Sequence, residues 1–171
     1  MLRCDFRSVV AGALAGMMVF ASMPVSAADK SASRTVLGSV NAVGPVELRG
    51  FSISQEGTLF AGDSIRAREK GYAKVLLGNG TKLELAEKTE IRVSPDNQGV
   101  QIALNAGTIG FTAHKPVRID VQPFEIIAAD DAAGSVAVMG SASAGVRSIK
   151  GNVTVRNLKT SESFVLLKGQ E

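Results

Sequence analysis

The sequence is short of the residues on which most catalytic and metal sites depend. Its 171 residues include one cysteine, one histidine, one tyrosine and no tryptophan. The cysteine, Cys4, lies before an apolar stretch rather than at a cleavage site, so it is not the acylated cysteine of a lipoprotein. A chain with so few thiols and imidazoles lacks the ligands of a zinc site and the nucleophile of thiol catalysis. We therefore expect no enzyme, no metal site and no bound cofactor.

Positive charge is not concentrated in this chain, although its isoelectric point is about 9.2. Of the 19 basic and 16 acidic residues, three lie in the first 27, which leaves 17 and 15 with both signs interspersed. The densest basic cluster, Arg66, Arg68 and Lys70, is interrupted by Glu69 and predicts a solvated strand end and turn. Nucleic-acid surfaces combine a positive stripe with stacking rings, and only six aromatic residues follow residue 27. We therefore expect no nucleic-acid partner.

The N-terminus has the three parts of a secretory signal peptide. Two arginines precede an uncharged apolar stretch at Val9–Met23, and Pro24 is followed by small residues. This pattern predicts a signal peptide at residues 1–27, with cleavage between Ala27 and Ala28. The alternative is an uncleaved anchor, but about 15 helical residues span only roughly 22 Å, less than the bilayer core of about 30 Å.

Export has consequences for the compartment and for the forces that stabilise the fold. After cleavage the chain is expected to hold no cysteine and no integral membrane anchor, so its core must stabilise it without disulfides. We expect it to be periplasmic, or secreted into the medium, in a bacterium. Residues 28–34 are polar and aperiodic, which predicts a flexible N-terminus, and residues 35–171 are the right length for a single domain.

From Val36 onward, apolar residues recur at every second position. Leu83 and Leu85 show this spacing, as do Ile91 and Val93. Residues two apart project from the same face of a strand, so each segment has one apolar face and one polar face. Many short strands about ten residues apart predict an all-β fold. The arrangement is expected to be an antiparallel β-sandwich, jelly-roll-like, or a short β-solenoid.

Turn residues separate the predicted strands. Gly78-Asn79-Gly80 predicts a tight hairpin, because Asn-Gly tolerates the positive φ that such a turn needs. Ser94–Gly99 predicts a second, longer turn. Ala128–Ala144 is rich in alanine, glycine and serine, and we expect a small-residue loop flanking a short strand there. Further turns are expected at four glycines, Gly107, Gly134, Gly151 and Gly169.

Few polar residues are candidates for a functional site. His114 is expected to be exposed in a turn between two strands. Adjacent residues of a strand point to opposite faces, so Asp130 and Asp131 predict a solvated turn, with a calcium site as the alternative if the backbone turns there. Asp63, which follows Gly62, is expected to bond nearby backbone amides. No residue stands out as partner-binding.

Several short motifs follow one another in an order that matches a known family. Leu59–Ile65 is similar to the step L-x-x-G-D-x-I, and Gly71–Leu77 with Asn79–Leu85 is similar to the hairpin A-x-L-x-L-x-D-G-S-x-L-x-L. Gln122-Pro123 stands where Thr-Pro is usual, whereas Ala129-Asp130-Asp131 replaces a Gly-Thr turn. From about Val36 to Gln170 the chain thus resembles the FecR domain, and the remaining matching segments are Thr89–Val93, Ile102–Ile109, Gly151–Val155 and Val165–Gln170.

The resemblance implies a periplasmic β-rich module. The best-known FecR members regulate sigma factors through a cytoplasmic segment, a membrane span and a receptor-contacting region, none of which we expect in this chain. We expect an exported, non-enzymatic binding or scaffolding module whose partner is an unidentified envelope protein or polysaccharide. The alternatives are a ligand-sensing or carbohydrate-binding module, which the scarcity of aromatics disfavours, and an accessory role in sigma-factor and receptor signalling.

Overall fold

The computed structural model describes residues 34–97, 99–140 and 142–171. The predicted signal peptide at residues 1–27 lies outside the described residues, and so does all of the predicted flexible segment at 28–34 except Arg34. All regular secondary structure in the described part of the chain is β-strand. In that part, no helix has the length and apolar character needed to cross a membrane.

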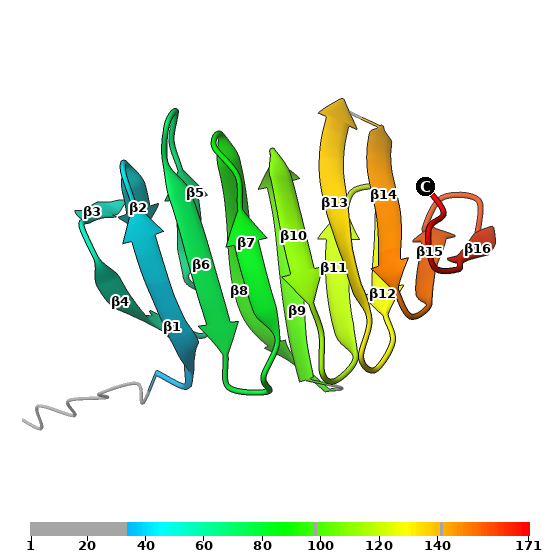
Figure 1. Ribbon diagram of the computed structural model, residues 1–171, viewed down its shortest axis with the longest axis horizontal. Helices are drawn as coiled ribbons and strands as arrows, with labels where there is room; N and C mark the ends of the chain where they lie inside the picture. The colour runs from blue at the N-terminus through cyan, green and yellow to red at the C-terminus, as the bar shows by residue number, and fades with distance from the viewer. Residues whose placement is uncertain (1–33, 98, 141) are drawn as a thin grey trace, which may run out of the picture. The chain divides into compact units, whose positions relative to one another are not determined.

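The strands form two sheets, which lie as two layers (Figure 1). Sheet A has seven strands, in the spatial order β14 (Ser143–Lys150), β13 (Ala133–Gly140), β10 (Thr108–Thr112), β7 (Lys82–Leu85), β6 (Tyr72–Leu77), β1 (Val36–Val43) and β4 (Glu56–Phe60). Sheet B has nine strands, in the order β16 (Ser163–Leu166), β15 (Val153–Asn157), β12 (Phe124–Ala128), β11 (Val117–Val121), β9 (Gly99–Ala106), β8 (Thr89–Asp96), β5 (Ser64–Ala67), β2 (Val46–Leu48) and β3 (Phe51–Ile53).

The chain crosses repeatedly between the two sheets while it advances along them, as the colour gradient of Figure 1 shows. Neighbouring strands pair antiparallel, with one parallel pair among the described strands, β9 with β11. That pair is parallel because β10, which connects the two in sequence, belongs to the other sheet. The prediction of an all-β fold is confirmed, and the arrangement is a sandwich of two mostly antiparallel sheets.

The core lies between the inner faces of the two sheets, and the period of two in the sequence produces it. In β6, for example, Ala73, Val75 and Leu77 are buried, whereas Lys74 and Leu76 are exposed. Burying an aliphatic side chain contributes about 1.5–3 kcal/mol to the free energy of folding. The buried face of each strand can therefore stabilise the fold without the disulfides that many secreted domains need. The largest fully buried side chains are Leu59, Ile65, Leu77, Leu83, Leu85, Ile91, Ile102, Ile109, Ile119, Ile126, Val40 and Val46.

The predicted hairpin at Gly78-Asn79-Gly80 is confirmed. It joins β6 to β7, and Gly80 has a φ of 87°. The Leu77 amide donates to the Thr81 carbonyl oxygen at 2.9 Å, and the Thr81 amide donates to Asn79 Oδ1 at 3.0 Å. The turn residues expected from the sequence therefore make the bonds that close this turn.

Three expectations about turns differ from the structure, two of them in the length of the turn or loop. Ser94, Pro95 and Asp96 belong to β8 and pair with β9, so the connection is shorter than the predicted turn at Ser94–Gly99. Ala128–Ala144 contains more strand than expected, because β13 runs for eight residues and pairs with β14. The stretch between β12 and β13 is a loop, and Ala142 lies in the turn between β13 and β14.

Gly134 was expected to mark a turn, but it lies within β13. A Cβ at this position would come within 2.9 Å of the Phe111 ring and would overlap the Arg147 carbonyl oxygen. The small residue thus reflects close packing of a strand between its neighbours, which a sequence does not distinguish from a turn. Gly107, Gly151 and Gly169 do lie between or after strands with positive φ, as predicted.

Candidate functional site

The edges of the two sheets are the places where this fold leaves backbone groups for a partner. Sheet A ends at β4 and β14, and sheet B ends at β3 and β16. An edge strand presents N–H and C=O groups that another strand can pair with. The edges are therefore the first candidates for a binding site, and both edges of sheet A border a hollow, β14 beside Met139 and β4 at Glu56.

The register of sheet A determines which groups of β14 face outward. The Val138 amide donates to the Gly107 carbonyl oxygen at 2.9 Å, so Val138 bonds toward β10 and not toward β14. In an antiparallel pair, bonded and non-bonded residue pairs alternate. Ala144 lies opposite Val138 and Val146 lies two residues further along, so the N–H and C=O groups of both point to the open side of β14.

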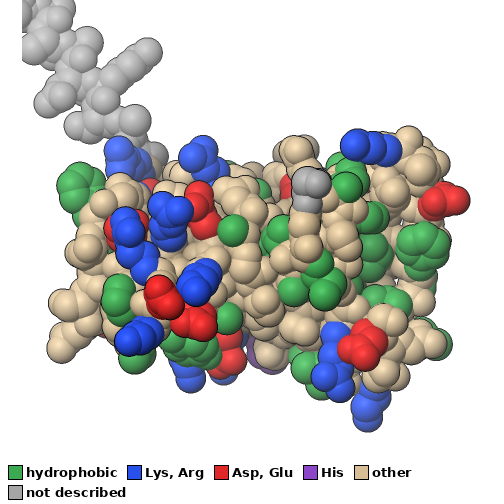
Figure 2. Space-filling model, turned by 90° about the horizontal axis from the view of Figure 1, so that it is seen from above, with side chains coloured by type: hydrophobic (Ala, Val, Ile, Leu, Met, Phe, Trp, Pro, Cys, Tyr) green, Lys and Arg blue, Asp and Glu red, His purple; other side chains and the backbone are tan. Residues whose placement is uncertain are grey.

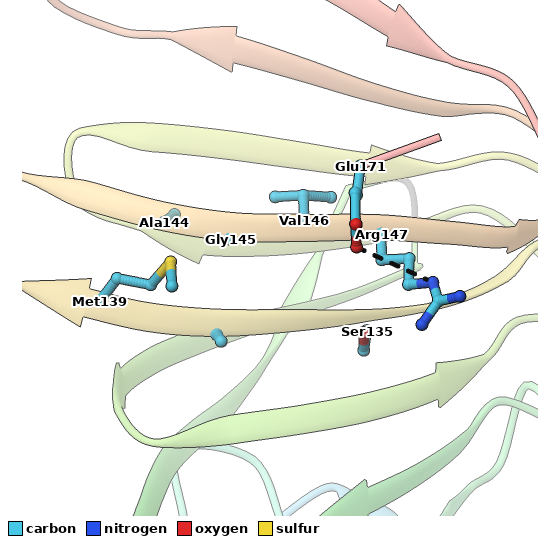
Figure 3. Close-up of a pocket in the computed structure, with 8 residues that line it drawn as sticks. Ser135, Met139, Ala144, Gly145, Val146, Arg147 and Glu171 are labelled. Carbon is cyan, nitrogen blue, oxygen red and sulfur yellow. Dashed lines mark ion pairs between the residues drawn. The ribbon is translucent and has the colours of Figure 1, made fainter. Parts of the chain in front are cut away.

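A groove of about 500 Å³ lies over β13 and β14 (Figure 3). Its small lining residues include Ala137 and Gly145, which lie opposite each other in the sheet. Met139, 73% exposed, stands at one end of the groove, and Arg147 with Glu171 stands at the other (Figure 3). The Arg147 Nε and the Glu171 carboxylate are 4.0 Å apart. The groove thus offers an apolar floor, an adaptable thioether and a polar end.

The C-terminal segment already pairs with part of the β14 edge. The Ser148 amide donates to the Gln170 carbonyl oxygen at 3.0 Å, and the Gly169 amide donates to the Ser148 carbonyl oxygen at 2.8 Å. The outward backbone groups of Ser148 are thus bonded by a turn that contains Gly169, whose φ is 83°. The neighbouring outward groups, at Val146 and Ala144, continue the same edge toward Met139.

The opposite sheet has an apolar edge at its end. β16 has Phe164 and Val165 exposed on its two faces, and Leu167, which follows the strand, is also exposed. In sequence this is a run of four apolar residues without alternation, Phe164 to Leu167. That run was the available signal in the sequence for an uncovered edge.

Charged side chains on the outer face of sheet B form a connected network. Arg118 lies between two carboxylates, with its Nη1 3.3 Å from Asp96 Oδ2 and its Nε 3.1 Å from Glu125 Oε1. Arg156 extends the network to the other oxygen of Glu125 at 3.6 Å. Because Asp96, Arg118 and Glu125 are each less than one-third exposed, water screens these pairs less than ordinary surface pairs.

The two arginines of the predicted basic cluster each pair with a glutamate. The Arg68 Nε–H donates to Glu47 Oε1 at 2.7 Å, and Arg66 Nε is 3.4 Å from Glu90 Oε2. Arg66 lies in β5 and Lys70 in the turn that follows, so the prediction of a strand end and turn is confirmed. Figure 2 shows basic and acidic side chains intermingled, without a stripe of one sign on the face in view.

Of the candidate polar residues named from the sequence, His114 and Asp131 lie close to each other. His114 is exposed between β10 and β11, as expected, and its Nδ1 is 3.2 Å from Asp131 Oδ1. Asp131 has a φ of 52°, in the loop between β12 and β13, so the backbone does turn at the acidic pair. Even so, no three histidine, cysteine, aspartate or glutamate side chains gather into a metal-binding group in the described part of the chain.

Asp63 has the role that the sequence predicted. Its Oδ2 accepts the Phe60 amide at 2.9 Å, which closes the turn between β4 and β5. The Arg49 Nε, at 3.7 Å from the same oxygen, adds an ion pair from the turn between β2 and β3. Asp63 is buried, so its contribution is to hold the two turns together rather than to meet a ligand.

A second hollow lies on the outer face of sheet A, over β1, β6 and β7. Its lining includes Ser39, Asn41, Lys74 and Glu84 but no aromatic residue. Tyr72 is nearby, and the Lys74 ammonium is 5.9 Å from the centre of its ring. Burial raises the pKa of Tyr72 above its ordinary 10.0, and the hydrogen bond and the charge of Glu84 raise it further. The hollow lacks the aromatic platform on which sugars stack.

Together, the two mostly antiparallel sheets define a β-sandwich module. Comparison with known protein families finds a match to "FecR: FecR protein" over residues 63–163. The match covers more than half of the chain, and the protein therefore belongs to the FecR family. The family suggests a signalling-related module. No curated protein matches the chain.

Proposed function

We propose that this protein is an exported, non-enzymatic FecR-family module that binds a protein partner in the cell envelope. The partner contributes an extended segment, which adds as a further strand to β14. The observation that carries this proposal is the outward orientation of the Ala144 and Val146 backbone groups beside the groove at Met139.

Strand addition suits the chemistry of this edge. Four backbone groups, two N–H and two C=O, are available at Ala144 and Val146, and the backbone bonds they make supply affinity. Alternate side chains of the added strand would lie over the groove, where the floor at Ala137 and Gly145 leaves room for them. Selectivity then comes from a partner side chain of medium size that contacts Met139, because a thioether packs against varied apolar shapes.

Two features of the sequence support a location in the envelope. The charge, hydropathy and small-residue pattern of residues 1–27 is that of a cleaved signal peptide. The part of the chain after this segment contains no cysteine, so oxidising conditions present no risk of wrong disulfides. The family supports a signalling role, and the edge at β14 supports a protein partner over a polysaccharide.

Photo-crosslinking in living cells tests the proposal. A photoreactive amino acid introduced at Met139 is expected to capture one defined envelope protein. The same amino acid at Thr58, an exposed residue of β4 at the opposite edge of sheet A, is the matched control and should not capture it. The Ala144→Pro variant should abolish capture from position 139, because proline lacks the N–H that the added strand needs.

The Ala144→Pro variant should still fold, because the Ala144 amide makes no ladder bond to β13. The Ala144→Thr variant keeps the N–H and should retain capture. Capture from position 139 that persists in Ala144→Pro with an unchanged melting temperature would exclude strand addition at β14. Capture of the same protein from Thr58 would show that the contact is not specific to this edge.

A further inference from the structure

Strand β16 is a four-residue edge strand without the charge, proline or bulge that often protect an edge. It pairs with β15 alone, in a regular register without a bulge, and no charged residue or proline lies between Ser163 and Leu167. Phe164 is 56% exposed and Val165 is 55% exposed, on opposite faces of the strand. Natural edge strands of this kind carry lysine, proline or a bulge when they are to remain unpaired.

The hydrogen bonds of the β15–β16 hairpin determine which backbone groups of β16 are free. The Asn157 amide donates to the Glu162 carbonyl oxygen at 2.8 Å. Hydrogen-bonded and non-bonded pairs alternate along an antiparallel hairpin, so Glu162 and every second residue after it bond to β15. Phe164 therefore bonds toward β15, whereas the N–H and C=O groups of Ser163 and Val165 face the open side. Leu167, the next outward residue, already bonds Gln170 through both its amide and its carbonyl oxygen.

The Phe164 side chain lies on the inner face of sheet B. It stands opposite Val155 in the register, and Val155 packs against the hydrophobic core. Sheet A ends at β14, and Figure 1 shows β15 and β16 past that strand. The inner face of sheet B at β16 is therefore apolar, and Phe164 remains more than half exposed there.

We propose that β16 pairs with β16 of a second copy of this chain, in antiparallel orientation across a two-fold axis. Charge favours this occupant, because Glu162 precedes the apolar run and Lys168 follows it. Antiparallel pairing of two copies brings the Glu162 end of each toward the Lys168 end of the other, whereas parallel pairing places like charges side by side. A two-fold contact of this kind is closed and self-complementary.

The free backbone groups select the register. Pairing Ser163 of each copy with Val165 of the other uses all four free groups on each strand and leaves the Leu167–Gln170 turn intact. The two-fold axis then passes between the two Phe164 residues, which face each other as a non-bonded pair with Cβ atoms about 4.5–5.5 Å apart. The two rings cover each other on the inner face.

Cysteine trapping tests both the contact and its register. The chain after residue 27 contains no cysteine, so single cysteines can be placed in the exported protein without interference. Phe164→Cys should form an intermolecular disulfide on mild oxidation, since two residues 164 lie within disulfide reach of each other. Val165→Cys, the matched control, lies on the other face opposite Ser163 of the second copy and should give at least tenfold less dimer.

Native mass spectrometry and sedimentation of the protein without cysteine substitutions provide the second readout. The expected result is a dimer, and Val165→Pro should weaken self-association by at least tenfold, because it removes an outward N–H and no ladder bond to β15. A monomeric protein at micromolar concentration, or disulfide formation that is equal at positions 164 and 165, would overturn the proposal. So would a disulfide from position 164 to a different protein.

The contact at β14 and the contact at β16 can be disrupted separately. Ala144→Pro should leave the dimer intact, and Val165→Pro should leave crosslinking from Met139 intact, because they remove amides of different sheets. Loss of both contacts in either variant would show a general loss of folding, which the melting temperature reports.

Discussion

The hydroxyl of Thr89 and the backbone of Thr108 bond each other in both directions. Thr89 Oγ1 accepts the Thr108 amide at 3.0 Å and donates to the Thr108 carbonyl oxygen at 3.0 Å. Thr89 is fully buried in sheet B, whereas Thr108 begins β10 in sheet A. A single side chain thus links the two layers at the β9–β10 turn, where the chain crosses between the sheets.

Replacing Thr89 with valine is expected to destabilise the fold by about 0.5–1.5 kcal/mol, because the Thr108 amide loses its acceptor, whereas the Thr108 carbonyl oxygen keeps the bond from the Ala86 amide. Thr81 offers a matched control, since it is equally buried and its Oγ1 has no hydrogen-bond partner among the described residues. Thr81→Val should be neutral or stabilising by about 1 kcal/mol. Urea denaturation of both variants measures the difference, and equal losses would contradict the assignment of the Thr89 bonds.

Glycine at position 107 is required for two separate reasons. Its φ is 83°, and a Cβ there would lie 2.5 Å from the Cα of Thr89. Gly62 has nearly the same φ, 81°, but open space around it. Gly62→Ala should therefore show only the cost of the left-handed conformation, about 1–2 kcal/mol. Gly107→Ala should lose about 1–3 kcal/mol more, because it also forces two strands apart. A similar melting temperature for the two variants would contradict the packing argument.

Tyr72 is the only tyrosine and there is no tryptophan, so ultraviolet absorbance follows its ionisation without interference. The midpoint is expected above 10.0, because burial and Glu84 both favour the neutral phenol. Glu84→Gln should lower this pKa but leave it raised, since burial is the larger cause. A pKa raised by folding contributes stability that is fully present below pH 10 and is lost as the pH rises through the folded value. A midpoint unchanged by Glu84→Gln would contradict the role of Glu84.

Export makes a simple prediction about the mature N-terminus. Expression of the full chain in a Gram-negative host should yield a periplasmic protein that begins at Ala28, as read by intact-mass measurement. Ala27→Leu should block processing, because signal peptidase reads small residues next to the cleavage site. A cytoplasmic protein that retains Met1 would contradict the proposed compartment.

Much of the fold can be predicted from the local sequence pattern of alternating apolar residues and turn residues. The alternation in β6 and β7 and the glycines between them identified the hairpin and its buried residues, because strand faces and tight turns depend on residues close in sequence. The same reasoning failed at Gly134, where the need for a small residue comes from Phe111 and Arg147 on the neighbouring strands. It also ended β8 too early at Ser94, because proline is tolerated where its missing N–H removes no ladder bond.

The candidate site depended on information that local pattern does not contain. His114 was expected to be exposed, yet its partner Asp131 comes from a loop 17 residues away. Likewise, the apolar run Phe164–Leu167 marks an exposed edge only because the structure places β16 last in sheet B. The sequence by itself determined an all-β chain with one apolar face per strand, because side-chain alternation is a property of each strand. The tertiary structure alone decided which strands are edges, because an edge is defined by the absence of a neighbour, and neighbours are set by long-range pairing.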